Sequence, residues 1–365
     1  SSTSIVTSFS HYYFFLPLIF FLNIIITTYI SPDSKGHGTE KVIKAIHKLN
    51  SKIRFRVVPI KAITTIATLS FGGSVGKEGP SAQIGAALAS TFSDLFKLSK
   101  EDREKLVICG ISAGFASVFG TPIAGAIFGV EVLFMGNLLY SVLLPSFISG
   151  MISYQISTLM GINYHYFFMS FDKLFDPRFF LIIILAGIFF GLTSVIFIET
   201  LKHTEKLANK LKIWAPYKGV IGGLLLIGIT LIFSRDFLGL GLNSIDTALT
   251  TGDIIWYAFI IKIIATAVTL AFGGSGGVIT PIFFIGSTAG VAFASLFNLN
   301  PVIFAGFGLV SVLAGAANTP LAACILAVEL FGPEVAPYAT IACILSFLMT
   351  GYRSVFPSQI LSFSK

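Results

Sequence analysis

The chain has 365 residues, of which 55% are hydrophobic and only 11% are charged, whereas soluble globular domains carry about 25% charged residues. This composition excludes an ordinary soluble domain and favours a helical membrane protein, in which the 35 glycines allow helices to pack closely. The net charge of +7 is densest between Lys41 and Lys61. Short basic connections beside membrane spans are typical of the cytoplasmic side, so we expect no nucleic-acid partner.

The first predicted membrane span covers residues 11–30, an apolar stretch that contains no Lys, Arg, Asp or Glu. It is long enough to cross a bilayer and longer than the core of a signal peptide. A polar link, SPDSKGHGTEK, and an amphipathic piece to about residue 54 follow it. Beyond them we expect apolar segments at roughly 57–71, 80–96, 106–119, 122–140, 141–161 and 178–199.

A polar connection at about 199–215 divides the chain into a first repeat, about 11–198, and a second repeat, about 216–365. The second repeat holds apolar segments at roughly 216–234, 253–272, 281–297, 302–316, 319–331 and 336–350. Several segments are shorter than the roughly 20 residues that a spanning helix needs. We therefore predict a single transmembrane domain, 1–365, in which half-helices broken by Gly and Pro end inside the membrane, buried in protein or lining a cavity.

The two halves resemble each other in sequence. Residues 61–85 read KAITTIATLSFGGSVGKEGPSAQIG and residues 262–286 read KIIATAVTLAFGGSGGVITPIFFIG, so both contain FGGS, a later proline and a closing Ile-Gly. The residues that precede the first copy are basic, whereas those that lead to the second copy, residues 235–262, include three aspartates. This contrast favours opposite membrane orientations. Gly-rich breaks in two inverted halves are typical of a transporter whose site lies between the halves.

Glu78 is the strongest candidate for a functional side chain. It lies in GSVGKEGPSAQIG, where glycines free the backbone and Pro80 suits the first turn of a helix. The amides and the dipole of a helix start attract an anion, so the Glu78 carboxylate can occupy the place of one. An acid inside the membrane is costly and usually functional, although a structural cap is the plainer alternative. The second half has Ile279 at the equivalent position.

Two further helix starts can add donors for an anion. In SGGVITP the amides of Val278 and Ile279 would complete a cage of main-chain groups, unless the segment is only a helix-breaking turn. In the link Gly36-His37-Gly38, the histidine can donate to an anion or titrate near neutral pH. A lone histidine in a loop is more often simply solvated.

Other residues favour structural roles. Glu131 and Glu329 occupy equivalent places in the repeats TPIAGAIFGVEVL and TPLAACILAVELF, and we expect each to bind backbone or a helix end in its own half. Phe356 has the character of a core aromatic. The histidines and cysteines show no metal-ligand spacing, and no nucleophile–base pair is evident, so we expect no metal, no cofactor and no enzymatic activity.

From about residue 11 to its end, the chain resembles the CLC family of chloride channels and chloride/proton antiporters, in its compact prokaryotic form without regulatory domains. GKEGP at 76–80 is similar to the gating-glutamate motif, SGGVITP to the second anion-binding motif, and FGTPIAGAIFGVE at 119–131 to a further family stretch. The resemblance implies an all-α membrane fold of two inverted repeats, whose short, broken helices meet at a central anion site. It also implies a homodimer surrounded by lipid in the plasma (inner) membrane of a prokaryote. Each subunit would have its own pore for chloride or other small anions and, in antiporters, for protons.

The resemblance also assigns roles to single residues. Glu78 becomes the external gate, displaced by an anion or by protonation. His37 falls where many members have a serine that coordinates the central anion, and Phe356 falls near a tyrosine whose hydroxyl does the same. The anion-binding positions implied in this way are Gly36, His37, Gly38, Gly76, Lys77, Gly79, Gly277, Val278, Ile279 and Phe356.

Two departures from the family pattern bear on mechanism. Antiporters often carry a second glutamate for internal protons, but this chain has Val132 there, as channels commonly do. Phe356 lacks a hydroxyl, which should weaken central binding and speed anion exit. These features favour passive conduction gated by Glu78. The alternative is chloride/proton exchange, because some members manage without the second glutamate. Selectivity for fluoride or another anion is a lesser alternative, because Val278 replaces an acid expected in fluoride-selective relatives.

Overall fold

The computed structural model describes residues 11–135, 137–169 and 177–361. These residues form fifteen α-helices and one two-stranded parallel sheet, in which β1 (Phe134–Met135) pairs with β2 (Ile360–Leu361). Within this part of the chain, six helices are long and apolar enough to cross a membrane, and shorter apolar helices lie between them. The mixture of long and short helices agrees with the half-helices that the sequence predicts.

The first half supplies the helices from the N-terminal span to the long helix before the polar connection. In chain order these are α2 (Leu16–Ile25), α3 (Gly38–Lys48), α4 (Val57–Ser70), α5 (Glu78–Leu95), α6 (Lys100–Phe119), α7 (Pro122–Glu131), α8 (Tyr140–Leu159) and α9 (Pro177–Lys210). A π-helical turn, Ile26–Ile30, extends α2. The N-terminal apolar stretch is therefore helical over most of its length.

The second half contributes a shorter set of helices. In chain order these are α10 (Ala215–Ile232), α11 (Leu242–Thr250), α12 (Ala258–Ala271), α13 (Ile279–Leu296), α14 (Pro301–Ala317), α15 (Pro320–Phe331) and α16 (Ala336–Thr350). Helices α4 and α12 both have 14 residues, and α5 and α13 both have 18. The repeated sequence segments therefore form helices of equal length in both halves.

Local signals explain where several helices begin and end. The Ser99 hydroxyl accepts from the Asp102 amide at the start of α6, and the helix ends at Gly120, whose positive φ suits glycine. The Asn300 side chain accepts two amides at the start of α14, and Asn318 closes that helix in the left-handed conformation. These polar caps separate helices that would otherwise read as one apolar run.

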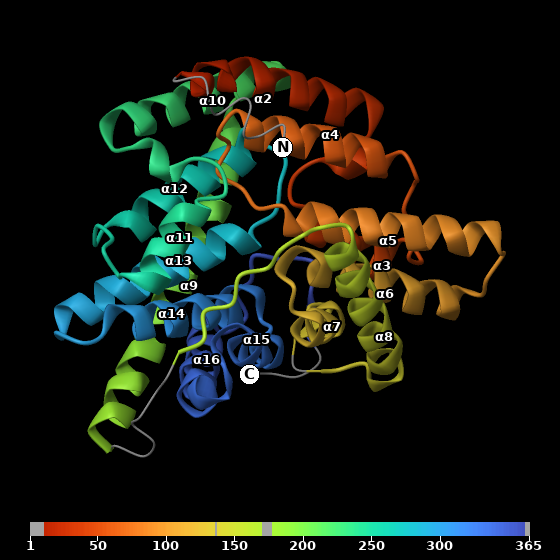
Figure 1. The fold of residues 1–365 in the computed structure, drawn as a ribbon. Coiled ribbons are helices and arrows are strands. Elements are labelled where there is room, and N and C mark those ends of the chain that lie inside the picture. Colours follow the sequence, from red (N-terminus) through yellow and green to blue (C-terminus); the bar gives the residue numbers. More distant parts are fainter. Residues whose placement is uncertain (1–10, 136, 170–176, 362–365) are drawn as a thin grey trace.

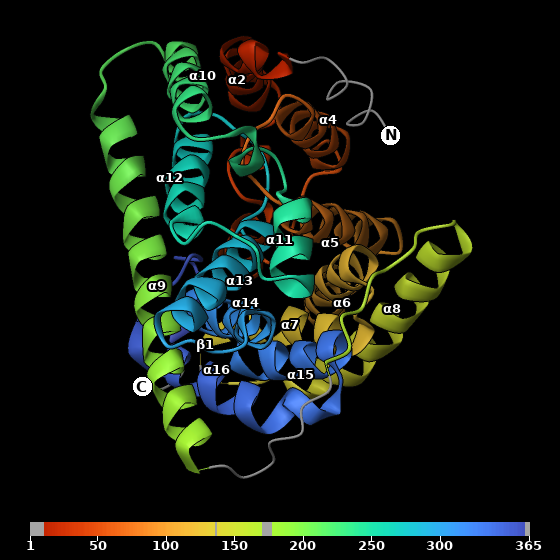
Figure 2. The same cartoon turned by 60° about the vertical axis from the view of Figure 1, so that its left-hand side comes forward.

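The two halves pack side by side. In Figure 1, α3, α5, α6 and α8 lie on the right and α11 to α14 on the left. Helices α2 and α10, one from each half, lie together at the top in Figure 1 and in Figure 2, and Figure 2 shows α9 as one long helix along an edge. The core is centred on α13, in which every residue from Ile279 to Ala294 is buried. This buried helix begins where the two halves meet.

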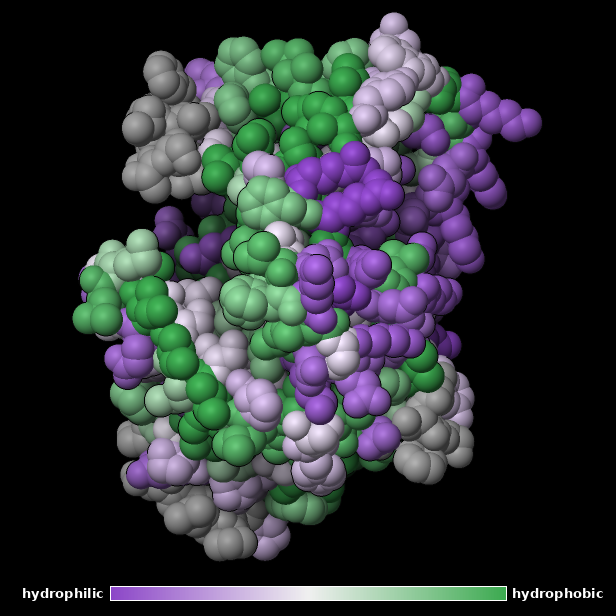
Figure 3. Space-filling model, turned by 90° about the vertical axis from the view of Figure 1, so that its right-hand side faces the viewer, coloured by the Kyte–Doolittle hydropathy of each residue, from purple (hydrophilic) through white to green (hydrophobic). Residues whose placement is uncertain are grey.

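The surface differs from that of a soluble protein. Figure 3 shows wide hydrophobic areas beside a band of hydrophilic residues. The connections α3–α4 and α5–α6 lie on this side of the molecule and expose charged residues, among them Arg54, Arg56, Lys97 and Lys100. Exposed apolar side chains on helices of this length are expected to face lipid.

The structure differs from the sequence-based expectations at three places. The helix expected at 122–140 ends at Glu131, and the chain then enters β1. Most of the polar connection expected at 199–215 belongs to α9, which continues to Lys210 and leaves only residues 211–214 between α9 and α10. Helix α11, Leu242–Thr250, lies in a stretch for which we had no helix. Its nine residues are too few and too mixed in polarity to show a clear apolar run.

Candidate functional site

Three glycine-rich segments meet at the junction of the halves. The backbone of His37 bridges Gly276, and Gly76 pairs with Gly277. In this last pair, each amide donates to the other carbonyl, at 2.8 and 2.7 Å. The starts of helices α3, α5 and α13 are therefore held side by side by main-chain contacts.

Glycine is required for this close approach. A Cβ atom on Gly38 would lie 2.3 Å from the backbone oxygen of Gly79, so any side chain would push α3 away from α5. The amides of Gly76 and Gly277 each donate to the carbonyl of the other residue. These two residues therefore line the site without offering a free donor. The side chain of Lys77 is exposed, away from the buried meeting point.

The carboxylate of Glu78 lies across the junction, at the start of the other half's helix. Glu78 is the first residue of α5 and is only 2% exposed. Its Oε2 accepts from the Thr280 amide at 3.2 Å, and its Oε1 accepts from the Thr280 hydroxyl. The N-terminus of a helix attracts negative charge. Glu78 thus occupies the position that an anion would take at the start of α13.

Thr280 is a site residue that sequence reasoning missed. It stands directly before Pro281 in the first turn of α13, where the sequence showed only a helix start. Val278 and Ile279 precede it, and amides of a first helical turn have no acceptor within their own helix. The predicted donors and the Glu78 carboxylate therefore gather at one helix end.

His37 and Phe356, which come from opposite ends of the chain, face each other. Their ring centroids are 5.8 Å apart. His37 precedes α3 without capping it, and its buried Nδ1 atom has no hydrogen-bond partner among the described residues. Burial lowers the pKa of the His37 imidazole, and the positive charge of Lys61 lowers it further, so we expect a neutral ring.

The segment that carries Phe356 is fixed by side-chain hydrogen bonds. Phe356 is fully buried, and its amide donates to the Ser354 hydroxyl at 2.9 Å. Gln359 accepts from the Ser354 hydroxyl at 2.5 Å and donates to the carbonyl of Val132 at 2.9 Å. Val132, which the resemblance places where antiporters often carry a second glutamate, is itself fully buried.

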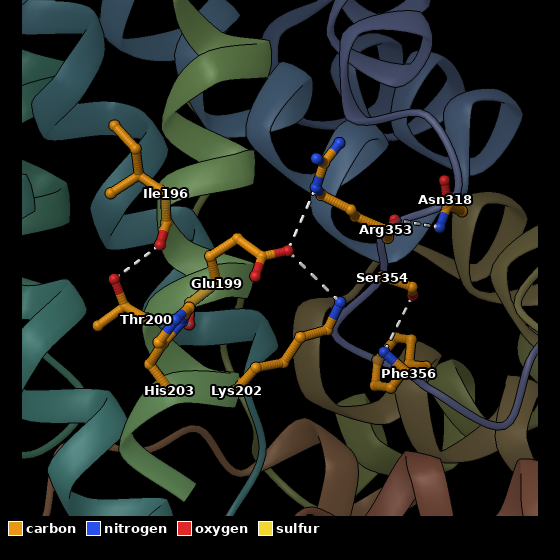
Figure 4. A network of polar contacts seen from close by, with 9 residues as sticks. All are labelled: Ile196, Glu199, Thr200, Lys202, His203, Asn318, Arg353, Ser354 and Phe356. Atoms are coloured by element: carbon orange, nitrogen blue, oxygen red, sulfur yellow. Dashed lines mark hydrogen bonds and ion pairs between the residues drawn. The ribbon is translucent and has the colours of Figure 1, made fainter. Parts of the chain in front are cut away.

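Charged contacts at the surface anchor the same segment. Figure 4 shows Arg353 and Lys202 at the same oxygen of Glu199 on α9, Oε1, at 3.2 and 3.6 Å. The Arg353 carbonyl accepts from Asn318 at 2.9 Å. Glu40 on α3 accepts from the amide and the hydroxyl of Ser358. Burial raises the pKa of the Glu40 carboxyl, and the bonds from Ser358 oppose that rise.

Glu131 and Glu329 exchange partners between the halves, which corrects our expectation that each stays in its own half. Glu131, at the end of α7, accepts from the amides of Leu321 and Ala322 at the start of α15. Glu329, on α15, accepts from the first amides of α7 at 3.0 and 2.7 Å. Both acids are structural caps, as predicted, but they cap the opposite repeat.

Several known proteins are similar to this chain in sequence. A family model described as voltage gated chloride channel matches residues 18–351. A "Chloride/fluoride channel protein" of Pseudomonas syringae pv. tomato is 38% identical over 335 residues, which cover 90% of this chain and 74% of the relative. The "H(+)/Cl(-) exchange transporter ClcA" of Salmonella paratyphi B is 28% identical over 348 residues, which cover 88% of this chain and 72% of the relative.

The fold is also found among solved structures. The crystal structure of a CLC-type fluoride/proton antiporter matches with a TM-score of 0.94 and 28% sequence identity, over 99% of this chain and 92% of that chain. This similarity confirms the predicted all-α membrane fold, with two inverted repeats and short, broken helices.

Proposed function

Since this chain belongs to the voltage-gated chloride channel (CLC) family, it is an integral membrane protein that transports anions, and we propose that it exchanges them for protons. The observation that carries this proposal is the position of Glu78, whose carboxylate takes both donors of Thr280 at the start of α13. An anion and an ionised Glu78 compete for these donors, whereas a protonated Glu78 leaves them to the anion. Such competition is the minimum requirement for coupling the two fluxes.

The names of two of the similar proteins support exchange over the passive conduction that Val132 and Phe356 favoured. One relative is named an H(+)/Cl(-) exchange transporter and one solved structure is a fluoride/proton antiporter. The 38% identical relative is named a chloride/fluoride channel protein. We therefore take chloride and fluoride as the two candidate anions, and the lesser alternative of fluoride selectivity gains weight.

Within this proposal Glu78 is the gate, and the amides of Val278 and Ile279 hold the anion beside it. His37 presents its unpartnered Nδ1 to the anion, and Phe356 closes the site by packing rather than by a hydrogen bond. We further propose a homodimer with one pore per subunit in the plasma membrane of a prokaryote, because the bacterial relatives fit that setting.

Passive conduction is a second candidate. The observation that favours it is Val132, a fully buried apolar side chain at the place where a second acid would pass protons on. If protons have no internal route, displacement of Glu78 opens a path for anions alone. The two candidates differ in one measurable quantity, the proton flux driven by an anion gradient.

The test places purified protein in liposomes and records anion efflux and external pH together, with chloride and with fluoride. An exchanger moves protons uphill when only the anion gradient is imposed. In that case Glu78→Gln should abolish proton movement while anion movement persists. Glu205→Gln, at an exposed site on α9, is the control and should behave as wild type. Anion efflux without proton movement in the wild type would establish passive conduction.

A further inference from the structure

Glu40 is a half-buried acid close to the site. It lies three residues after His37, in the first turn of α3. Its two carboxylate oxygens accept from the amide of Ser358, at 3.1 Å, and from the hydroxyl of the same residue. Ser358 follows Phe356 by two residues. The contact between Glu40 and Ser358 therefore joins the same two segments as the contact between the rings of His37 and Phe356.

The start of α3 also touches the helix that begins with Glu78. A Cβ atom on Gly38 would lie 2.3 Å from the backbone oxygen of Gly79, and a Cβ atom on Gly79 would lie 3.4 Å from the hydroxyl oxygen of Thr39. Gly79 directly follows Glu78, and Thr39 directly precedes Glu40. The two acids are therefore carried by helices whose first turns are in contact.

The surroundings of Glu40 act on its charge in opposite directions. Burial raises the pKa of its carboxyl, whereas the bonds from Ser358 and the charges of Lys41 and Lys44 lower it. The chain-end segment contributes only the neutral Ser358 to this contact, and Asp33 acts on Lys41 from the turn before α3. Lys44 is exposed, and basic connections of this kind are typical of the cytoplasmic side. Glu40 thus lies between the site and water on that side.

The acid next to Val132 is placed differently. Glu131 is only 5% exposed, and both of its oxygens accept from amides at the start of α15. The chain-end segment covers this region as well, because Gln359, the residue after Ser358, donates to the Val132 carbonyl at 2.9 Å. Of the two acids that lie beside this segment, Glu40 is the one that water can reach.

We propose that Glu40 takes protons from the cytoplasmic side and passes them toward Glu78, and that Ser358 is its partner in the ionised state. A proton from water forms an O–H bond on the carboxylate, and that bond breaks when the proton moves on, so Glu40 is unchanged after each cycle. While it is protonated, its bonds from Ser358 lose the contribution of the charge. This inference rests on the proposed exchange and adds the inner acid that exchange requires.

The test places purified protein in liposomes, imposes a chloride or a fluoride gradient, and records halide efflux and external pH together. Proton transfer by a positioned side chain contributes about 10²–10⁴-fold to a rate, so Glu40→Gln should lower the proton flux by on the order of tenfold or more while halide efflux persists. Glu40→Asp keeps an acid and should retain part of the proton flux. The matched control is Asp33→Asn, which removes another acid near Lys41 and should leave the proton flux unchanged.

A second measurement separates proton transfer from a purely structural contact. The Ser358 hydroxyl lowers the pKa of Glu40 by bonding to its charged form, so Ser358→Ala should raise that pKa. With equal pH on both sides of the membrane, the pH midpoint of the proton flux should then move upward. A contact that serves packing alone would lower the melting temperature and leave this midpoint in place.

The outcomes are distinct. Exchange in the wild type with the same proton flux in Glu40→Gln would overturn the inference and leave the proposed exchange intact. Equal loss of proton flux in Glu40→Asp and Glu40→Gln, with a lower melting temperature in both, would also overturn it, because the role would then be structural. If Glu40→Gln does not fold, the midpoint in Ser358→Ala decides. A wild-type protein that moves no protons would overturn the proposed exchange itself, and this role of Glu40 with it.

Discussion

At the scale of single residues, the proposal is that Glu78 and a transported anion compete for the same donors. The Thr280 amide and hydroxyl, together with the first amides of α13, can neutralise one negative group at a time. In the present structure that group is the Glu78 carboxylate. Under the proposed exchange, the anion enters only when Glu78 has gained a proton or moved aside.

His37 should distinguish anions by the hydrogen bond it offers. Fluoride is the strongest hydrogen-bond acceptor among the halides, so His37→Ala should weaken fluoride transport more than chloride transport. A hydrogen bond to a charged group contributes about 1.5–3 kcal/mol, a factor of about 10 to 150 in affinity. Because chloride loses part of the same energy, we expect the fluoride-to-chloride ratio to fall by roughly tenfold. Flux measured with ion-selective electrodes gives this ratio.

The control for this prediction is His203→Ala, because His203 is exposed on α9 and bonds only a backbone oxygen of its own helix. An unchanged ratio in His37→Ala would mean that the ring nitrogen does not face the anion.

The sequence predicted part of this site. Glu78 and the helix starts were evident from glycine spacing, because a break in an apolar run is a local property. The neighbourhood of His37 and Phe356 followed only from the resemblance to a family. The bond from Thr280 to Glu78 could not be predicted, because it depends on how two segments far apart in sequence cross.

At the scale of elements, the helices α7 and α15 stabilise each other at their ends. Each begins with free amides and ends near an acid, and the acid of one caps the amides of the other. A carboxylate at a helix start is favourable both as an acceptor and as a charge opposite to the helix dipole. Four bonds thus tie the two repeats together away from the anion site.

Glu131→Gln should lower stability without a direct effect on the anion. The amide group keeps one acceptor but turns an N–H group toward the helix amides, at a cost of about 2 kcal/mol. The melting temperature in detergent should fall by roughly 3–6 °C. Glu205→Gln, on the exposed face of α9, should leave it almost unchanged.

A Glu131→Gln protein with the wild-type melting temperature would show that this cap contributes little. A loss of proton coupling at unchanged stability would point instead to a role for Glu131 in proton transfer.

Most helices could be predicted because they are apolar runs bounded by Gly, Pro or polar residues. Helix α4, expected at 57–71, spans Val57–Ser70, and α16 was expected at its observed residues. The errors have physical causes. The run after Glu131 is apolar but pairs as a strand with the chain end, and α11 is short. The exchange of caps between repeats could not be predicted, because sequence alone does not show which helix ends are neighbours.

At the scale of the whole molecule, reciprocal hydrogen bonds join the two halves. The Ser74 amide and hydroxyl contact Thr269 and Thr266 on α12, at 3.1 and 3.0 Å. In return, the Ser275 amide donates to Thr68 on α4 at 3.0 Å. Each glycine-rich motif is therefore held by a helix of the opposite half. Neither half can form its share of the site alone, because the supporting hydroxyls come from the other.

The chain should therefore tolerate a cut between the halves but not the absence of either half. The connection at 211–214 is exposed and lies between α9 and α10, and exposed connections accept breaks more readily than buried ones. Fragments 1–212 and 213–365, expressed together, should copurify and transport anions in liposomes. Each fragment alone should aggregate, because unpaired acids and hydroxyls would face lipid. A fragment that elutes alone as a single folded species would show that the bonds between halves are not required for folding.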